Sequence, residues 1–263
     1  MRIASWNVNS LKVRLPQVLD WLASEPVDVL CLQETKLEDV AFPVEAFESA
    51  GYYIAFSGQK TYNGVALISR TPLTDVVCGN PHFADDPQKR LIAATVDGIR
   101  VISAYVPNGQ AVGSEKYAYK LSWLEALTVW VKAELSAWPE LALCGDYNIA
   151  PADADVHDPA SWVGQILCSE PERSAFQRLL TLGLQDSFRC FEQPEKSFSW
   201  WDYRMLGFQK NQGLRIDHIL LSHPLAARCS AAGIDRMPRK HERPSDHAPV
   251  WTDVRYAEQV AQT

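Results

Sequence analysis

Five short polar motifs, spread along the whole chain, each lie beside an apolar run. They are Trp6-Asn7-Val8-Asn9, Leu32-Gln33-Glu34-Thr35, Gly145-Asp146-Tyr147-Asn148, Arg215-Ile216-Asp217-His218 and Ser245-Asp246-His247. Each motif carries a carboxylate, an amide or an imidazole, which are groups that bind cations or transfer protons. A fold that brings these groups to one point would build a catalytic site.

The oxygen-rich part of this set favours a hard divalent cation. Its carboxylates and amides are Glu34, Asp146, Asp217, Asp246, Asn7, Asn9 and Asn148. The sequence has no Cys and His spacing that is typical of zinc. Magnesium, with manganese as a substitute, takes only one or two protein carboxylates directly. We therefore expect Glu34 as the inner ligand, with Asn7 and Asp246 near it.

His247 directly follows Asp246, so the two side chains diverge on an extended backbone and a third group has to orient the imidazole. Asp217 is the candidate, because a carboxylate that accepts one ring N–H fixes the tautomer of the ring. Taken singly, His247 also fits a turn and Glu34 an ordinary strand-end charge. Their joint occurrence favours a site.

The elements that must position these motifs follow from the hydrophobic pattern. Strands are expected at 2–8 and 27–33, separated by a helix at 15–23 that Pro16 could open. Further strands are expected at 52–56, 64–69, 91–96, 100–106, 141–145, 198–200, 215–221 and 248–254, and further helices at 115–138 and 173–182. This order predicts an α/β fold, with sheets inside and helices outside.

Length and composition fit a single domain over residues 1–263, since the hydrophobic content is 47% and no low-complexity linker is present. No secretory signal and no membrane-spanning stretch is recognisable, which predicts a cytoplasmic protein without a membrane partner. The six cysteines are widely spaced, which predicts buried thiols. The net charge of −7 counts against a nucleic-acid partner, but it says little about a local face.

In chain order, the motifs resemble the exonuclease III family of class II apurinic/apyrimidinic endonucleases, a branch of the endonuclease/exonuclease/phosphatase superfamily. The resemblance covers essentially the whole chain, and it includes Gly58-Gln59-Lys60, Ile149-Ala150-Pro151 and Ser199-Trp200-Trp201-Asp202-Tyr203-Arg204. The superfamily as a whole shares the Glu, Asp-x-Asn and Ser-Asp-His elements. The Gln59-Lys60 and Ser199 to Arg204 segments are more specific to the DNA-repair branch.

The resemblance implies a DNase I-like four-layer α/β sandwich, in which two mixed β-sheets pack face to face with helices outside. It also implies a Mg²⁺-dependent enzyme of base excision repair that acts on damaged double-stranded DNA. Such an enzyme incises on the 5′ side of abasic sites, or removes blocking groups and nucleotides from 3′ ends, and leaves a 3′-hydroxyl. We further expect a monomer. Its expected location is a bacterial-type cytoplasm, where it would associate with the nucleoid through its DNA substrate.

Catalytic roles carry over from the resemblance residue by residue. Asp146 would position or deprotonate the attacking water, although His247 remains an alternative general base. Asn148 would contact the same phosphate, and Asp217 would orient His247. Tyr105 would hydrogen-bond the scissile phosphate or assist the leaving group.

The resemblance also implies residues that hold the metal and the DNA. Glu34 would hold the metal, with Asn7 alongside and Asp246 close by. The wall of an abasic-site pocket is expected from Trp200, Leu214 and Ile216. Phosphate contacts, which would make binding depend on salt, are expected from Lys60, Arg90, Lys116 and Lys120.

Two alternatives stay open at this point. A superfamily phosphatase for inositol phosphates or sphingolipids would use the same core residues, and the acidic net charge favours it. The Trp200-Trp201 segment and the lack of a lipid-facing segment count against it. A catalytically silent DNA-binding relative would lack at least one catalytic position, whereas none of them is missing.

Overall fold

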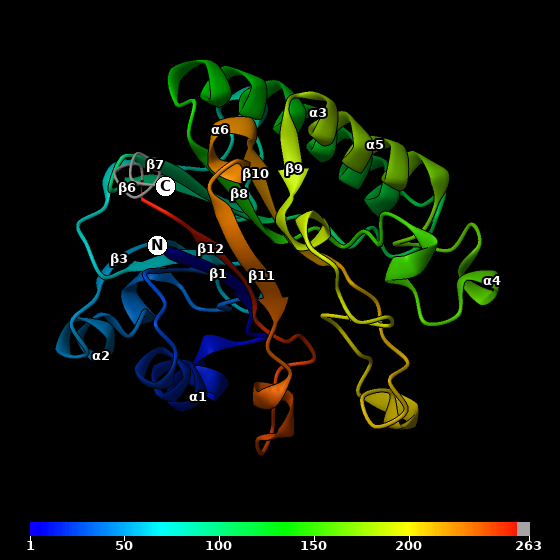
Figure 1. The fold of residues 1–263 in the computed structure, drawn as a ribbon, viewed down its shortest axis with the longest axis horizontal. Helices are drawn as coiled ribbons and strands as arrows, with labels where there is room; N and C mark the ends of the chain where they lie inside the picture. The colour runs from blue at the N-terminus through cyan, green and yellow to red at the C-terminus, as the bar shows by residue number, and fades with distance from the viewer. Residues whose placement is uncertain (257–263) are drawn as a thin grey trace.

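The computed structural model describes residues 1–256, and in that range two six-stranded sheets pack between two layers of helices. The first sheet has the order β11-β12-β1-β2-β4-β3 and the second β5-β6-β7-β8-β10-β9. Helices α3 and α5 cover one outer face, and α1 and α2 lie on the opposite side (Figure 1). The expected four-layer α/β sandwich of the DNase I type is confirmed.

The strands of the first sheet are β1 (Arg2–Asn7), β2 (Val29–Gln33), β3 (Tyr53–Ser57), β4 (Val65–Ser69), β11 (Cys229–Ile234) and β12 (Val250–Val254). Those of the second are β5 (Thr74–Cys78), β6 (Leu91–Val96), β7 (Ile99–Tyr105), β8 (Leu141–Asp146), β9 (Leu184–Asp186) and β10 (Asp217–Ser222). The helices are α1 (Leu11–Ser24), α2 (Val44–Ser49), α3 (Glu115–Ala137), α4 (Pro159–Trp162), α5 (Glu170–Thr181) and α6 (His223–Ala226).

Each sheet has one parallel pair at its centre, and its other pairs are antiparallel. In the first sheet β1 runs parallel to β2, with Asn7 beside Gln33. In the second sheet β7 runs parallel to β8, with Tyr105 beside Asp146. The carboxyl ends of β1, β2 and β8 therefore carry three of the polar motifs, and β7 ends beside them with Tyr105.

Two antiparallel neighbours add their starting residues to the same edge. Strand β10 begins with Asp217, which pairs with Asp146 at the end of β8. Strand β12 pairs with β1, so the segment before it, which contains His247, lies near the end of β1. The first strand of the chain thus lies between its neighbour β2 and a strand that comes more than two hundred residues later.

The alternation of side chains along the strands separates the layers. Ile3 on β1 and Cys31 on β2 face the core between the two sheets, where they meet side chains such as Ala142 and Cys144 of β8. Ala4 and Trp6 face the helix layer formed by α1. Within residues 1–256, no helix is long and apolar enough to cross a membrane.

One glycine is required by the close approach of β7 and β8. A Cβ atom on Gly145 would lie 1.8 Å from the carbonyl oxygen of Ala104. No side chain fits there, so the residue before Asp146 has to be glycine if the parallel pair is to keep its register.

Several expected elements differ from the structure. The first helix begins at Leu11 and contains Pro16 in its interior. Residues 198–200 form no strand, because only Trp200 makes isolated bridges, to Leu214 and to His247. Three strands were not predicted: β5 is an exposed edge strand, β9 has only three residues, and β11 has few bulky apolar side chains.

Candidate active site

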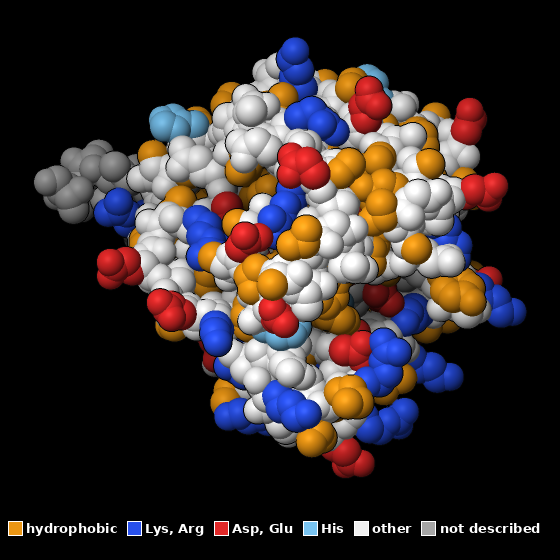
Figure 2. Space-filling view, turned by 90° about the vertical axis from the view of Figure 1, so that its right-hand side faces the viewer, with side chains coloured by type: hydrophobic (Ala, Val, Ile, Leu, Met, Phe, Trp, Pro, Cys, Tyr) orange, Lys and Arg blue, Asp and Glu red, His pale blue; other side chains and the backbone are white. Residues whose placement is uncertain are grey.

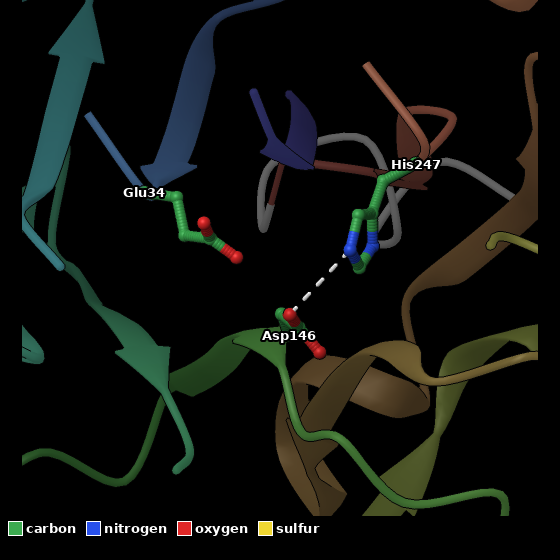
Figure 3. A group of neighbouring side chains, drawn as sticks. All are labelled: Glu34, Asp146 and His247. Atoms are coloured by element: carbon green, nitrogen blue, oxygen red, sulfur yellow. Dashed lines mark ion pairs between the residues drawn. The ribbon is translucent and has the colours of Figure 1, made fainter. Parts of the chain in front are cut away.

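The polar strand ends of the two sheets meet around a gap between Glu34, Asp146 and His247. One ligand atom from each of these three side chains lies within 4.8 Å of the others. Glu34 follows β2 of the first sheet, Asp146 ends β8 of the second, and His247 precedes β12. The three side chains point toward one another in Figure 3.

Asn7 links the two carboxylates across the sheets. Its side-chain Nδ2 donates to Glu34 Oε1 and to Asp146 Oδ2, both at 2.8 Å. Its amide oxygen accepts the backbone N–H of Asn9 at 2.9 Å. Asn7 therefore lies alongside Glu34 and positions both carboxylates through its amide nitrogen.

Asp217 holds the imidazole of His247 through a hydrogen bond from its Nδ1. Its Nδ1 lies 2.9 Å from Asp217 Oδ2, while its Nε2 faces Asp146 Oδ2 at 3.7 Å. The hydroxyl of Ser199 donates to the same Asp217 oxygen at 2.6 Å. The imidazole therefore presents Nε2 to the gap, as expected for a ring that Asp217 orients.

The pKa values of the buried groups differ from their ordinary values. Burial raises the pKa of Asp146 to about 7, partly offset by His247. Burial alone would lower the pKa of His247, but the carboxylates of Asp217 and Asp146 raise it to about 10. Burial opposes ionisation of Glu34 as well, yet Lys36, at 2.9 Å, together with Asn7 lowers its pKa.

The side chains at the gap fit a hard divalent cation. Two carboxylates, one of them with a lowered pKa, face the same space with a single imidazole. Oxygen donors of this kind suit magnesium or manganese rather than a soft metal. The backbone at Glu34 has a φ of 53°, a left-handed conformation that is strained for this side chain, whereas Asn148, with a φ of 49°, adopts the same region more readily.

Asp246 and Trp200 form a neighbouring cluster at the rim. Asp246 accepts hydrogen bonds from Asn9 Nδ2 and from Trp200 Nε1, both at 3.0 Å. Both of its oxygens are therefore engaged, and it is not among the three residues around the gap. Trp200 is partly exposed, whereas Leu214 and Ile216 are 0% and 1% exposed. Leu214 and Ile216 pack in a small core against Trp200, so of the three residues expected to wall the pocket Trp200 is the one that reaches the surface.

Tyr105 and Asn148 lie on the side of the gap formed by β7 and β8. The phenol of Tyr105 donates to Glu34 Oε1 at 2.9 Å, and burial together with Glu34 raises its pKa well above the ordinary value. Asn148 Nδ2 donates to the carbonyl oxygen of Val106 at 3.0 Å. Its Oδ1 accepts from Asn108 Nδ2 at 3.1 Å.

The residues expected to contact DNA phosphates divide into two groups. Lys60 and Lys116 are exposed, and Arg90 is half-buried with its guanidinium 4.6 Å from the centre of the Tyr105 ring. Arg90, Lys116 and Asn108 line a hollow of about 680 Å³ beside the gap. Lys120, in contrast, is 0% exposed and forms an ion pair with Glu172. The expectation of a phosphate contact by Lys120 is therefore wrong.

Sequence reasoning missed three residues of the site. Asn108 follows β7 just as Asn148 follows β8, so its position after an apolar run was the available signal. Lys36 lies two residues after Glu34, so a charge close to a candidate ligand was the available signal. Ser199 opens the Ser199 to Arg204 segment of the resemblance, which was the available signal, although the sequence alone does not pair it with Asp217.

Comparisons with known proteins agree with this geometry. A family model described as the endonuclease/exonuclease/phosphatase family matches residues 4–247. The exodeoxyribonuclease III of Haemophilus influenzae is 38% identical over 267 residues, which cover 97% of this chain and 100% of that protein. The solved structure of the 3′ phosphatase NExo from Neisseria, bound to a product DNA hairpin, has a TM-score of 0.96 and 50% identity, covering 97% of this chain and 100% of that one. An AP endonuclease from Archaeoglobus fulgidus has a TM-score of 0.93 and 40% identity over the same shares.

Proposed function

Because the chain belongs to the endonuclease/exonuclease/phosphatase family, in its exonuclease III branch of DNA-repair nucleases, we propose that it hydrolyses phosphodiester bonds of damaged double-stranded DNA. The reactions are incision on the 5′ side of abasic sites and removal of blocking groups or nucleotides from 3′ ends, each leaving a 3′-hydroxyl. The observation that carries the proposal is the convergence of Glu34, Asp146 and His247 within 4.8 Å from distant strands.

The two raised pKa values support separate roles for Asp146 and His247. With a pKa of about 7, Asp146 is ionised in a useful fraction at neutral pH and accepts a proton from the attacking water. With a pKa of about 10, His247 stays protonated and donates a hydrogen bond to the phosphoryl oxygen. This difference favours Asp146 over His247 as the general base.

Glu34 is the direct ligand for Mg²⁺, with Mn²⁺ as a substitute, in this proposal. When bound, the cation would act as a Lewis acid that neutralises charge on the phosphate oxygens. Asn7 holds the carboxylates of Glu34 and Asp146 beside each other, where they would face a bound ion. Asp246 would lie outside the direct ligands and could hydrogen-bond a water of the ion, since magnesium keeps several of its waters.

Asn148 and Tyr105 complete the proposed contacts to the phosphate. The amide of Asn148 is fixed beside Asp146 by its hydrogen bonds to Val106 O and Asp146 Oδ2, from where it would turn one N–H to the phosphate, and loss of one such donor costs about 3 kcal/mol of barrier. Tyr105 keeps its proton, because its pKa is raised well above the ordinary value. Its phenol is therefore a hydrogen-bond donor near Glu34, where it supports the phosphate or the departing 3′-oxygen.

Basic side chains around the site supply the contacts to the DNA backbone. Lys60, Arg90 and Lys116 lie on the β3–β4, β6 and α3 side of the gap, where the hollow of about 680 Å³ is located. Lys and Arg side chains also gather over the lower part of the face in Figure 2, at the height of the loops around residues 201–212 and 236–243 in Figure 1. A protein with a net charge of −7 can thus bind DNA through a local basic surface. We propose Trp200 as the residue that meets the abasic sugar.

We propose further that residues 1–263 act as one domain and as a monomer in the cytoplasm. The two sheets share one central core, which supports a single domain. All three residues around the gap come from one chain, so the proposed site needs no second copy.

Cleavage of defined duplexes tests the proposed function. End-labelled duplexes that carry one abasic-site analogue, or one 3′-phosphate, are incubated with the protein in Mg²⁺ and then in EDTA. We expect nicking 5′ of the lesion or release of the 3′ block, in Mg²⁺ only. If the protein left both duplexes intact and hydrolysed a phosphoinositide instead, the proposal would be wrong.

A further inference from the structure

A fully buried ion pair lies directly beneath the turn that carries Asn148. Lys120 of α3 and Glu172 of α5 both have side chains that are 0% exposed. Two buried charges cost more in desolvation than their attraction returns, unless further hydrogen bonds complete them. The neighbours of this pair therefore indicate what it does.

The ammonium group of Lys120 uses all three of its donors. It donates to the carbonyl oxygen of Asn148 at 2.7 Å, to the carbonyl oxygen of Asn108 at 3.2 Å, and to Glu172 Oε1. The side chains of Asn108, in the turn after β7, and Asn148, in the turn after β8, meet at 3.1 Å. One buried cation thus joins the backbones of two adjacent amide residues.

Glu172 fixes this cation to a rigid element. Its Oε1 also accepts the backbone N–H of Leu167 at 3.1 Å, and its Oε2 accepts the N–H and the hydroxyl of Ser169 at 3.1 and 2.5 Å. Ser169 caps the start of α5 and lies 2.7 Å from the hydroxyl of Tyr117 on α3. The carboxylate is thereby held by both helices that cover this sheet.

We propose that Lys120 is a positioning residue for phosphodiester hydrolysis. It touches no DNA, but it holds the carbonyl groups of Asn108 and Asn148 and so directs both amides at the phosphate. The hydrogen bond from Lys120 to the carbonyl oxygen of Asn148 fixes the left-handed backbone there, which has a φ of 49°. The inference rests on the proposed function, because Asn148 matters to catalysis only if this site cleaves a phosphodiester.

Two variants separate positioning from mere stabilisation. The double variant Lys120→Met/Glu172→Gln replaces the ion pair by two neutral side chains of similar size and leaves no unpaired charge. The single variant Glu172→Gln keeps the amine of Lys120, which can still donate to both carbonyl groups even without its charge. Burial already lowers the pKa of Lys120, and Glu172 is the main group that opposes this effect. Without the carboxylate of Glu172, the single variant has to bury either an unpaired charge or a deprotonated amine, whereas the double variant buries neither. The single variant is therefore expected to melt at a lower temperature than the double variant.

The measurements are the melting temperature and the single-turnover rate on the abasic duplex, with the folded fraction checked by circular dichroism. We expect the double variant to lose roughly 10²-fold in rate, as a catalytic group displaced by about 1 Å does, whereas Glu172→Gln keeps a rate near that of the wild type. The rate would then follow the presence of Lys120 and not the melting temperature. A purely stabilising role predicts the opposite order.

Lys116, one turn earlier on α3 and exposed, is the matched control. Lys116→Met should raise KM several-fold and weaken its salt dependence while kcat stays within about 2-fold, whereas the double variant should change kcat and leave KM unchanged. The inference is overturned if the double variant keeps the wild-type kcat, or if Glu172→Gln loses as much as the double variant. Failure of the wild type to cleave any damaged duplex would instead overturn the proposed function.

Discussion

Replacement of Asp146 by Asn should stabilise the folded protein in the absence of divalent metal, even though it removes the proposed general base. Asp146 is 1% exposed, and burial raises its pKa from 3.8 to about 7. The folded chain therefore holds this proton more tightly than the unfolded chain does. Ionisation of Asp146 in the folded state has a cost that the Asn side chain avoids.

The size of the effect follows from the pKa difference and depends on pH. At about 1.4 kcal/mol for each pH unit, the cost is roughly 4 kcal/mol above pH 7 and roughly 2 kcal/mol at pH 5. The stability associated with the protonated carboxyl group is thus fully present below pH 3.8 and is lost as the pH rises to about 7. Asn accepts fewer hydrogen bonds than the carboxylate, which accepts from Asn7 and Asn148, and this offsets about 1–2 kcal/mol.

The net gain for Asp146→Asn is therefore about 2–3 kcal/mol at pH 8 and close to zero at pH 5. For a chain of this size, the gain at pH 8 corresponds to a rise in Tm of roughly 5–10 °C. Melting curves followed by circular dichroism in EDTA, at pH 5 and at pH 8, measure both values. Asp20→Asn, at an exposed carboxylate of α1, is the control and should leave Tm unchanged at both pH values.

Addition of Mg²⁺ extends the same experiment. The wild type should gain stability from the ion, and the variant should gain less, because the ion compensates the buried carboxylates. The difference between the two proteins at pH 8 should then shrink. An Asp146→Asn protein that melts at or below the wild-type temperature at both pH values in EDTA would refute the reasoning that ionised Asp146 destabilises the fold.

Three further changes have expected outcomes. Asp217→Asn should lower the pKa of His247, so that kcat falls by roughly 10²-fold and the alkaline limb of the pH–rate profile moves to lower pH; an unchanged profile would contradict the role of Asp217. Glu34→Gln should raise the Mg²⁺ concentration for half-maximal activity by more than about 10-fold, measured by titration with the metal. Gly145→Ala should lower the free energy of unfolding by about 3 kcal/mol in denaturant, because its Cβ would lie 1.8 Å from Ala104 O. The control Gly98→Ala, with nothing within 4 Å of its Cβ, should lower it by only about 1 kcal/mol. Equal losses in the two variants would show that the contact at residue 145 is easily relieved.

The sequence predicts the central part of the fold well, because that part consists of long apolar runs. Strands β6, β7 and β8 agree with their expected ranges to within one residue at each end. The exposed edge strand β5 was missed, since four of its five residues are exposed and it has no buried face to create a pattern. Edge strands depend on pairing with a neighbour rather than on their own side chains.

The site was predicted in its chemistry but not in its supporting contacts. The prediction for Lys120 was wrong because the residue was treated as a basic side chain near a motif. The spacing on α3 held the missing information: Lys120 belongs to the buried stripe that continues through Leu124, Leu127 and Val131. Glu172 similarly lies on the buried face of α5, with Ala175 and Phe176. A charge of each sign on two apolar stripes indicates a buried pair.

The pairing of β1 with β12 has a consequence for how the chain folds during its synthesis. The hydroxyl of Ser245 donates a hydrogen bond of 2.7 Å to the carbonyl oxygen of Asn7, which lies 238 residues earlier in the sequence. A nascent chain therefore holds its first strand without one neighbour until residues 245–254 have been translated. Contacts of such sequence separation form slowly. The active site therefore cannot form before residues 245–254 have been synthesised and have paired with β1.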